Sequence, residues 1–142
     1  MSTTGPCRAR KRSTMPVRSL SSSVVRWPEA VCVDDAVRRW AAEVVANHPG
    51  VLGIGYFGSY ARGDWGVGSD VDLVVVVEND DAPFARRAAR WDVTGLPVPA
   101  DLLVYTREEW ERLRGGRFYQ TLQSEAVWVY VRPDFAPRPS AA

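Results

Sequence analysis

The residues with the clearest chemical potential are two aspartates at the start of an aliphatic run. Asp70 and Asp72 flank Val71 and precede Leu73 and four valines, a run typical of a buried strand. Residues two apart on a strand point to the same face, so the two carboxylates are expected to converge. A buried strand does not hold two carboxylates at its start without a partner for their charge. The pattern therefore predicts an active site.

A glycine-rich turn precedes this strand. Gly58 and Ser59 are separated from Asp70 by ten residues, several of them small or polar. The free backbone N–H groups of such a turn bind phosphate oxygens, and paired carboxylates bind Mg²⁺. Together, the turn and the aspartates predict a site for Mg²⁺ and a polyphosphate.

The same region contains a competing motif. The segment 53–58 matches GxGxxG, and Glu78 lies where the ribose-binding acid of a dinucleotide fold would be. That fold needs a long helix directly after the motif, whereas three further glycines follow here, each costing about 1 kcal/mol in a helix. Gly53 and Gly55 instead fall inside a predicted strand, where glycine permits a bulge or a close backbone approach. We therefore prefer the polyphosphate site.

Hydrophobic periodicity and turn residues indicate which elements position the aspartates. The predicted helices span 34–46, 80–91, 106–113 and 117–124, and the predicted strands span 51–57, 71–77, 100–105 and 126–131. Thr106 and Glu109 have the spacing of a capping box, and Arg86, Arg87 and Arg90 are expected to be mostly solvated. This order of elements predicts a single α/β domain with a central sheet.

The charge distribution divides the chain into segments. Five of the 18 basic residues and no acidic residue lie in 1–18, so 13 basic and 17 acidic residues remain. We expect a disordered basic extension over 1–28, a folded domain over 29–134 and a flexible tail over 135–142. The acidic balance of the folded part argues against nucleic-acid binding. The absence of a long apolar run and of a disulfide framework predicts a cytoplasmic protein without a membrane span.

The quoted motif resembles a known signature. The segment 58–72, in which Gly-Ser is followed by Ala-Arg-Gly and then by Ser-Asp-x-Asp, resembles that of the DNA polymerase β-like nucleotidyltransferase superfamily. It is closest to the minimal nucleotidyltransferase (MNT) branch, and the resemblance covers about residues 34–131. It implies the nucleotidyltransferase fold, an α+β arrangement in which helices flank a small mixed sheet. It also implies a third acid on a neighbouring strand, for which Asp101 is the candidate.

The resemblance assigns the acids to metal binding and catalysis. Asp70 and Asp72 would bridge two Mg²⁺ ions about 4 Å apart. Asp101 would complete the catalytic metal site and draw the proton from the attacking hydroxyl. The three aspartates are therefore both the expected metal ligands and the expected catalytic residues.

The resemblance assigns the turn to nucleotide binding. Gly58 would offer a backbone N–H, Ser59 would bind the terminal phosphates, and Ser69 lies in the same motif. Arg62 could clamp phosphate oxygens or could pair with Asp64 on the surface. The sequence leaves the role of Arg62 open.

Members of the MNT branch pair with an all-helical HEPN protein that acts as an RNase toxin. The resemblance implies that this chain is an antitoxin that transfers AMP from ATP to a tyrosine of that partner. Two alternatives remain, because a fold specifies its substrate poorly. One is a small-molecule nucleotidyltransferase that works as a homodimer, and the other is a binding antitoxin without catalysis.

Overall fold

The structure, a computed structural model, describes residues 28–137. The helices are α2 (Ala30–Asn47), α3 (Ser59–Arg62), α4 (Phe84–Arg87), a 3-10 turn (Ala88–Arg90), α5 (Arg107–Leu113) and α6 (Arg117–Glu125). The strands are β1 (Val51–Phe57), β2 (Val71–Val77), β3 (Ala100–Thr106) and β4 (Val127–Val131). All but the last residue of the predicted basic extension, and the last five residues of the predicted tail, lie outside the described range.

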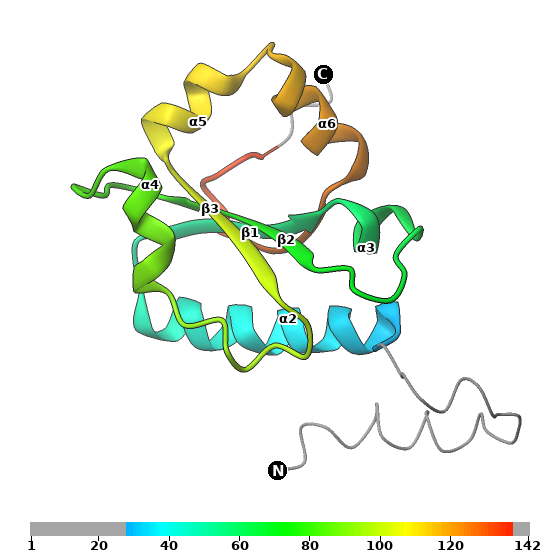
Figure 1. The fold of residues 1–142 in the computed structure, drawn as a ribbon. Coiled ribbons are helices and arrows are strands. Elements are labelled where there is room, and N and C mark those ends of the chain that lie inside the picture. The colour runs from blue at the N-terminus through cyan, green and yellow to red at the C-terminus, as the bar shows by residue number, and fades with distance from the viewer. Residues whose placement is uncertain (1–27, 138–142) are drawn as a thin grey trace, which may run out of the picture.

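The four strands form one sheet in the order β3-β2-β1-β4. β2 and β3 are parallel, and β1 is antiparallel to both of its neighbours. In Figure 1, α2 lies along one face of this sheet while α5 and α6 lie over the other. The architecture is therefore the expected nucleotidyltransferase fold, with helices on both faces of a small mixed sheet.

Alternate side chains of β2 enter two separate apolar clusters. Val71 and Val75 pack with the buried stripe of α2. Val74 and Val76 pack on the other face with Trp110 of α5. Burial on both faces explains why the strand is a continuous aliphatic run instead of an alternating pattern. The predicted bounds of β1 and β2 are both confirmed.

The glycines of β1 permit close packing, and the long helix that a dinucleotide site requires does not follow them. A Cβ at Gly55 would lie 3.0 Å from the Val127 carbonyl oxygen and 3.0 Å from the Trp128 ring. The pairing of β1 with β4 also shifts register beside Gly55. The helix after the motif, α3, has only four residues. The prediction of a bulge or close approach is confirmed.

Two predicted helices differ from the observed ones by more than one residue at an end. α2 begins at Ala30 and not at 34, and its N-cap, Glu29, makes no side-chain capping bond. The earlier start comes from tertiary packing, since Cys32 and Val33 are buried in the first turn. The predicted helix over 80–91 is reduced to α4 and the 3-10 turn that follows it.

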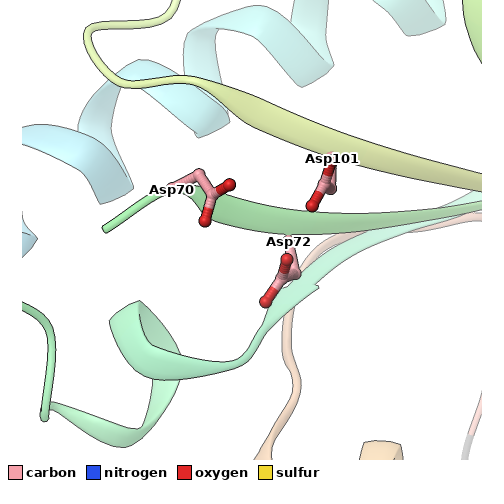
Figure 2. A group of neighbouring side chains, drawn as sticks. All are labelled: Asp70, Asp72 and Asp101. Carbon is pink, nitrogen blue, oxygen red and sulfur yellow. The ribbon is translucent and has the colours of Figure 1, made fainter. Parts of the chain in front are cut away.

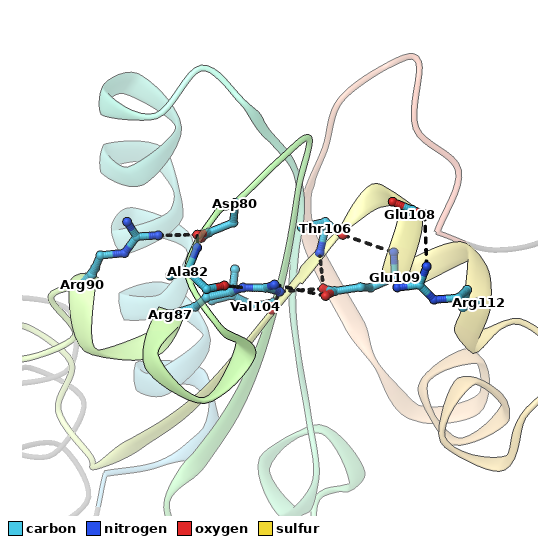
Figure 3. A network of polar contacts seen from close by, with 9 residues as sticks. All are labelled: Asp80, Ala82, Arg87, Arg90, Val104, Thr106, Glu108, Glu109 and Arg112. Atoms are coloured by element: carbon cyan, nitrogen blue, oxygen red, sulfur yellow. Dashed lines mark hydrogen bonds and ion pairs between the residues drawn. The ribbon is translucent and has the colours of Figure 1, made fainter.

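The prediction that Arg87 is mostly solvated is wrong, because this residue is only 5% exposed. Its guanidinium donates to both carboxylate oxygens of Glu109, at 2.5 and 3.0 Å, and to the Val104 carbonyl at 3.0 Å (Figure 3). Glu109 also belongs to the predicted capping box with Thr106, which is confirmed. A buried arginine needs such partners, and here they join α4, β3 and α5.

The described part of the predicted tail packs on the domain. Phe135 is buried beside Gly53 of β1. The Pro137 carbonyl accepts a hydrogen bond from the Gln123 side chain at 2.8 Å. Within residues 28–137, no helix combines the length and the apolar character needed to cross a membrane.

Candidate active site

Three aspartates meet at one edge of the sheet (Figure 2). Asp72 of β2 and Asp101 of β3 are partners in the parallel register, and Asp70 directly precedes β2. One carboxylate oxygen from each aspartate lies within 4.8 Å of the others. The sequence motif therefore places Asp70 and Asp72 together, and the parallel pairing of β2 with β3 adds Asp101.

The glycine turn directly contacts this cluster. β1 runs antiparallel to β2, and Phe57 at its end is paired with Asp72. Gly58 follows with φ 84° and ψ −154°, a conformation essentially restricted to glycine. A Cβ added at Gly58 would lie 2.1 Å from Asp72 Oδ2. Any other residue at this position would collide with the carboxylate.

The cluster is electrostatically suited to a divalent cation. Burial raises the pKa of Asp72, and the nearby charges of Asp70, Asp101 and Glu125 raise it further, against a lowering by Arg62. A cation held between the carboxylates would relieve this repulsion. Hard oxygen donors are the ligands that Mg²⁺ prefers, so the three aspartates fit the metal site that the sequence predicts.

The remaining predicted residues lie around the turn. Ser59 is half-buried at the first position of α3. The Ser69 hydroxyl accepts a hydrogen bond from the Gly66 N–H at 2.9 Å, which closes the loop before β2. Arg62 is exposed, and its Nε lies 3.1 Å from Asp64. The surface pair that the sequence left open for Arg62 is therefore formed, although such exposed pairs hold their partners weakly.

Sequence reasoning missed one residue of this site, Glu125. Its Oε2 accepts a hydrogen bond from the Gly58 N–H at 2.7 Å and lies 3.4 Å from Arg62 Nη1. Glu125 is the last residue of α6, and no motif spacing connects it to the turn. The one signal in the sequence was an acid at a predicted helix C-terminus, where the helix dipole disfavours negative charge.

Two aromatic residues, Trp65 and His48, pack on neighbouring rings. Trp65 stacks on the Tyr60 ring, with centroids 5.4 Å apart and planes at 10°. The His48 ring packs on the Trp91 ring, with their centroids 4.7 Å apart. The His48 and Trp91 rings line a cleft of about 510 Å³ beside Val51, the first residue of β1, and the aspartates lie outside its lining. His48 therefore lies outside the aspartate site.

Comparison with known proteins identifies the family. The sequence model of the nucleotidyltransferase domain matches residues 37–138. A candidate nucleotidyltransferase from Sulfolobus solfataricus has a similar structure, with a TM-score of 0.55 and 20% identity over 74% of this chain and 86% of that one. A mutant of the toxin–antitoxin MntA-HpeT is similar with a TM-score of 0.50 and 17% identity, over 68% of this chain and 74% of that chain. No curated protein sequence matched the chain. The chain belongs to the nucleotidyltransferase domain family and is a nucleotidyltransferase.

Proposed function

We propose that this nucleotidyltransferase is an antitoxin that transfers AMP from ATP to a tyrosine hydroxyl of a helical HEPN-type toxin. The observation that carries the proposal is the convergence of Asp70, Asp72 and Asp101 beside the Gly58 turn. The fold shared with the MntA-HpeT toxin–antitoxin supports a toxin chain as the acceptor. The alternatives, a small acceptor molecule or binding without catalysis, remain outcomes of the test below.

The three aspartates would hold Mg²⁺ in this proposal. When bound there, Mg²⁺ would neutralise the charge that develops on the phosphate and on the departing pyrophosphate. Asp72, which is half-buried and faces both other acids, would contribute to both ions of a two-metal site. Asp70 and Asp101 are more exposed, and they would complete the ligand sets from either side.

The chain's own residues would orient the reactants. The acceptor oxygen attacks the α-phosphorus of ATP in line, a new P–O bond forms, and the bond to the bridging oxygen breaks so that pyrophosphate leaves. Asp101, exposed on the edge strand β3, would take the hydroxyl proton. The Gly58 N–H, the Ser59 hydroxyl and Arg62 would hold the phosphates of ATP.

The test is a transfer assay with α-labelled nucleoside triphosphates, Mg²⁺ and a helical partner co-expressed with this chain. Asp70→Asn and Asp72→Asn should abolish labelling. Asp81→Asn is the control, because Asp81 is an exposed acid beyond the other end of β2. We expect ATP to be the preferred donor and a tyrosine of the partner to carry the label.

Two results would contradict the proposal. Labelling of a small hydroxyl compound without any partner chain would identify a small-molecule transferase. Neutralisation of the partner by both the wild type and Asp72→Asn, without label on either chain, would identify a binding antitoxin.

A further inference from the structure

The carboxylate of Glu125 holds two donors that the proposed function assigns to ATP. Its Oε2 accepts the Gly58 N–H at 2.7 Å and lies 3.4 Å from Arg62 Nη1. The side chain is only 15% exposed, so the carboxylate is enclosed between α6 and the turn. An anionic group therefore already lies where the phosphate oxygens are expected.

The position is electrostatically costly for a carboxylate. Glu125 is the last residue of α6, where the helix dipole disfavours negative charge. It also lies near the carboxylate of Asp72, so the two negative charges repel each other. A glutamine would accept the same hydrogen bond from Gly58 without either penalty. The charge of Glu125 is therefore unnecessary for holding the helix against the turn.

Arg62 is able to change partners. Its side chain is 48% exposed, and its contact with Glu125 is long for an ion pair. Its second partner, Asp64, is 61% exposed, and exposed pairs are individually weak. A polyphosphate carries more negative charge than one carboxylate and offers several oxygens, so it competes well for the same guanidinium.

We propose that Glu125 is a positioning residue that holds the Gly58 N–H and Arg62 in the orientation that binds phosphate and is displaced when a triphosphate enters. This inference rests on the proposed function only in placing the phosphates at the turn. Gly58 also contacts Asp72, so the contact that Glu125 makes fixes the turn relative to the metal cluster. Glu125 thus holds the turn and competes with phosphate for the same two donors, and we expect the competition to be the larger effect on affinity.

The test measures binding of tripolyphosphate with Mg²⁺ by titration calorimetry. This probe has the phosphates of ATP but no base, sugar or acceptor. We compare the wild type with Glu125→Ala, Glu125→Gln and Asp64→Asn. The last variant is the matched control, because it removes one negative charge that contacts Arg62 but leaves the hydrogen bond between Gly58 and Glu125 intact.

Glu125→Ala should bind tripolyphosphate about tenfold more tightly, because no carboxylate competes for the two donors. Glu125→Gln should gain less, since glutamine still accepts the Gly58 N–H as a neutral group. Asp64→Asn should change the affinity by less than about threefold, as expected for an exposed pair. A purely structural role for Glu125 predicts the opposite sign, with weaker binding once the turn is no longer held.

Three results would overturn the inference: unchanged or weaker binding in both Glu125 variants, equal tightening in Asp64→Asn, or no binding of tripolyphosphate by any of these proteins. Thermal unfolding checks that each variant is folded, and the conservative glutamine variant stands in if the alanine variant is not. The outcome is separable from the transfer assay. Labelling of a partner combined with unchanged affinity in the Glu125 variants would refute this inference alone, and tighter binding without labelling would refute only the proposed acceptor.

Discussion

Replacement of Gly58 by alanine tests whether the turn and the aspartate cluster form one unit. The added Cβ would lie 2.1 Å from Asp72 Oδ2, whereas ordinary contacts begin at 3.4 Å, so the two groups must separate by about 1.3 Å. A misplacement of about 1 Å at reacting groups costs on the order of 100-fold in rate. The backbone adds a cost of about 1–3 kcal/mol in stability, because φ 84° with ψ −154° is essentially restricted to glycine.

Gly63→Ala is the matched control for this variant. Gly63 ends α3 with φ 89° and ψ 8°, a left-handed conformation, and a Cβ there would have no neighbour within 4 Å. This substitution should cost about 1–2 kcal/mol in stability and should leave Asp72 in place. The pair therefore separates backbone strain, which both variants share, from displacement of the carboxylate, which only Gly58→Ala produces.

The assay combines urea unfolding, Mn²⁺ binding followed by electron paramagnetic resonance, and the labelled transfer reaction. Both variants should be destabilised, but only Gly58→Ala should lose Mn²⁺ affinity and about 100-fold or more in transfer rate. Equal metal affinity and equal transfer in the two folded variants would refute the close contact between the turn and Asp72.

Three further predictions follow from the described contacts. Burial and neighbouring acids raise the pKa of Asp72, so the folded protein binds the proton of this carboxyl more tightly than the unfolded chain does. Ionisation of Asp72 therefore destabilises the fold as pH rises. Asp72→Asn should increase the melting temperature measured at pH 7 without metal. The hydrogen bond from Arg87 lowers the pKa of Glu109 from 4.5 to about 2. The ionised Glu109 carboxylate therefore stabilises the folded protein fully above pH 4.5, and this contribution is lost as pH falls toward 2. Over this pH range the free energy of unfolding measured in urea should fall by at most about 3 kcal/mol, and by less because Glu109 is 27% exposed. Arg87→Met should remove this pH dependence. The same dependence of unfolding free energy on pH in wild type and variant would disprove the assignment. Gly55→Ala should destabilise the protein by about 1–3 kcal/mol, measured by the same method, because its Cβ would press on the Val127 carbonyl and the Trp128 ring.

Two kinds of element could be predicted from the sequence: strands that are buried on both faces, and features stabilised by contacts between residues close in the chain. β1 and β2 were located to the residue because their apolar runs end at glycine or charged residues. The capping box of Thr106 and Glu109 was also recognisable, since it depends on residues three apart in the chain.

Contacts between distant segments could not be predicted. Arg87 reads as a surface residue beside Arg86, and only the packing of α4 against β3 and α5 surrounds it with acceptors. The bond between Gly58 and Glu125 joins residues 67 positions apart. No local pattern encodes such a pairing, because it depends on where α6 ends relative to the sheet.

The sequence by itself determined which residues could do chemistry here. The Gly-Ser turn, the Asp-x-Asp pair and the aliphatic strand behind them are contiguous, and the period of a strand places Asp70 and Asp72 on one face. Only the tertiary structure decided how these parts meet. The parallel register of β2 with β3 brings Asp101 to Asp72, and the antiparallel end of β1 presses Gly58 against the same carboxylate. The end of α6 supplies Glu125, because strand pairing and helix packing set distances that chain spacing cannot specify.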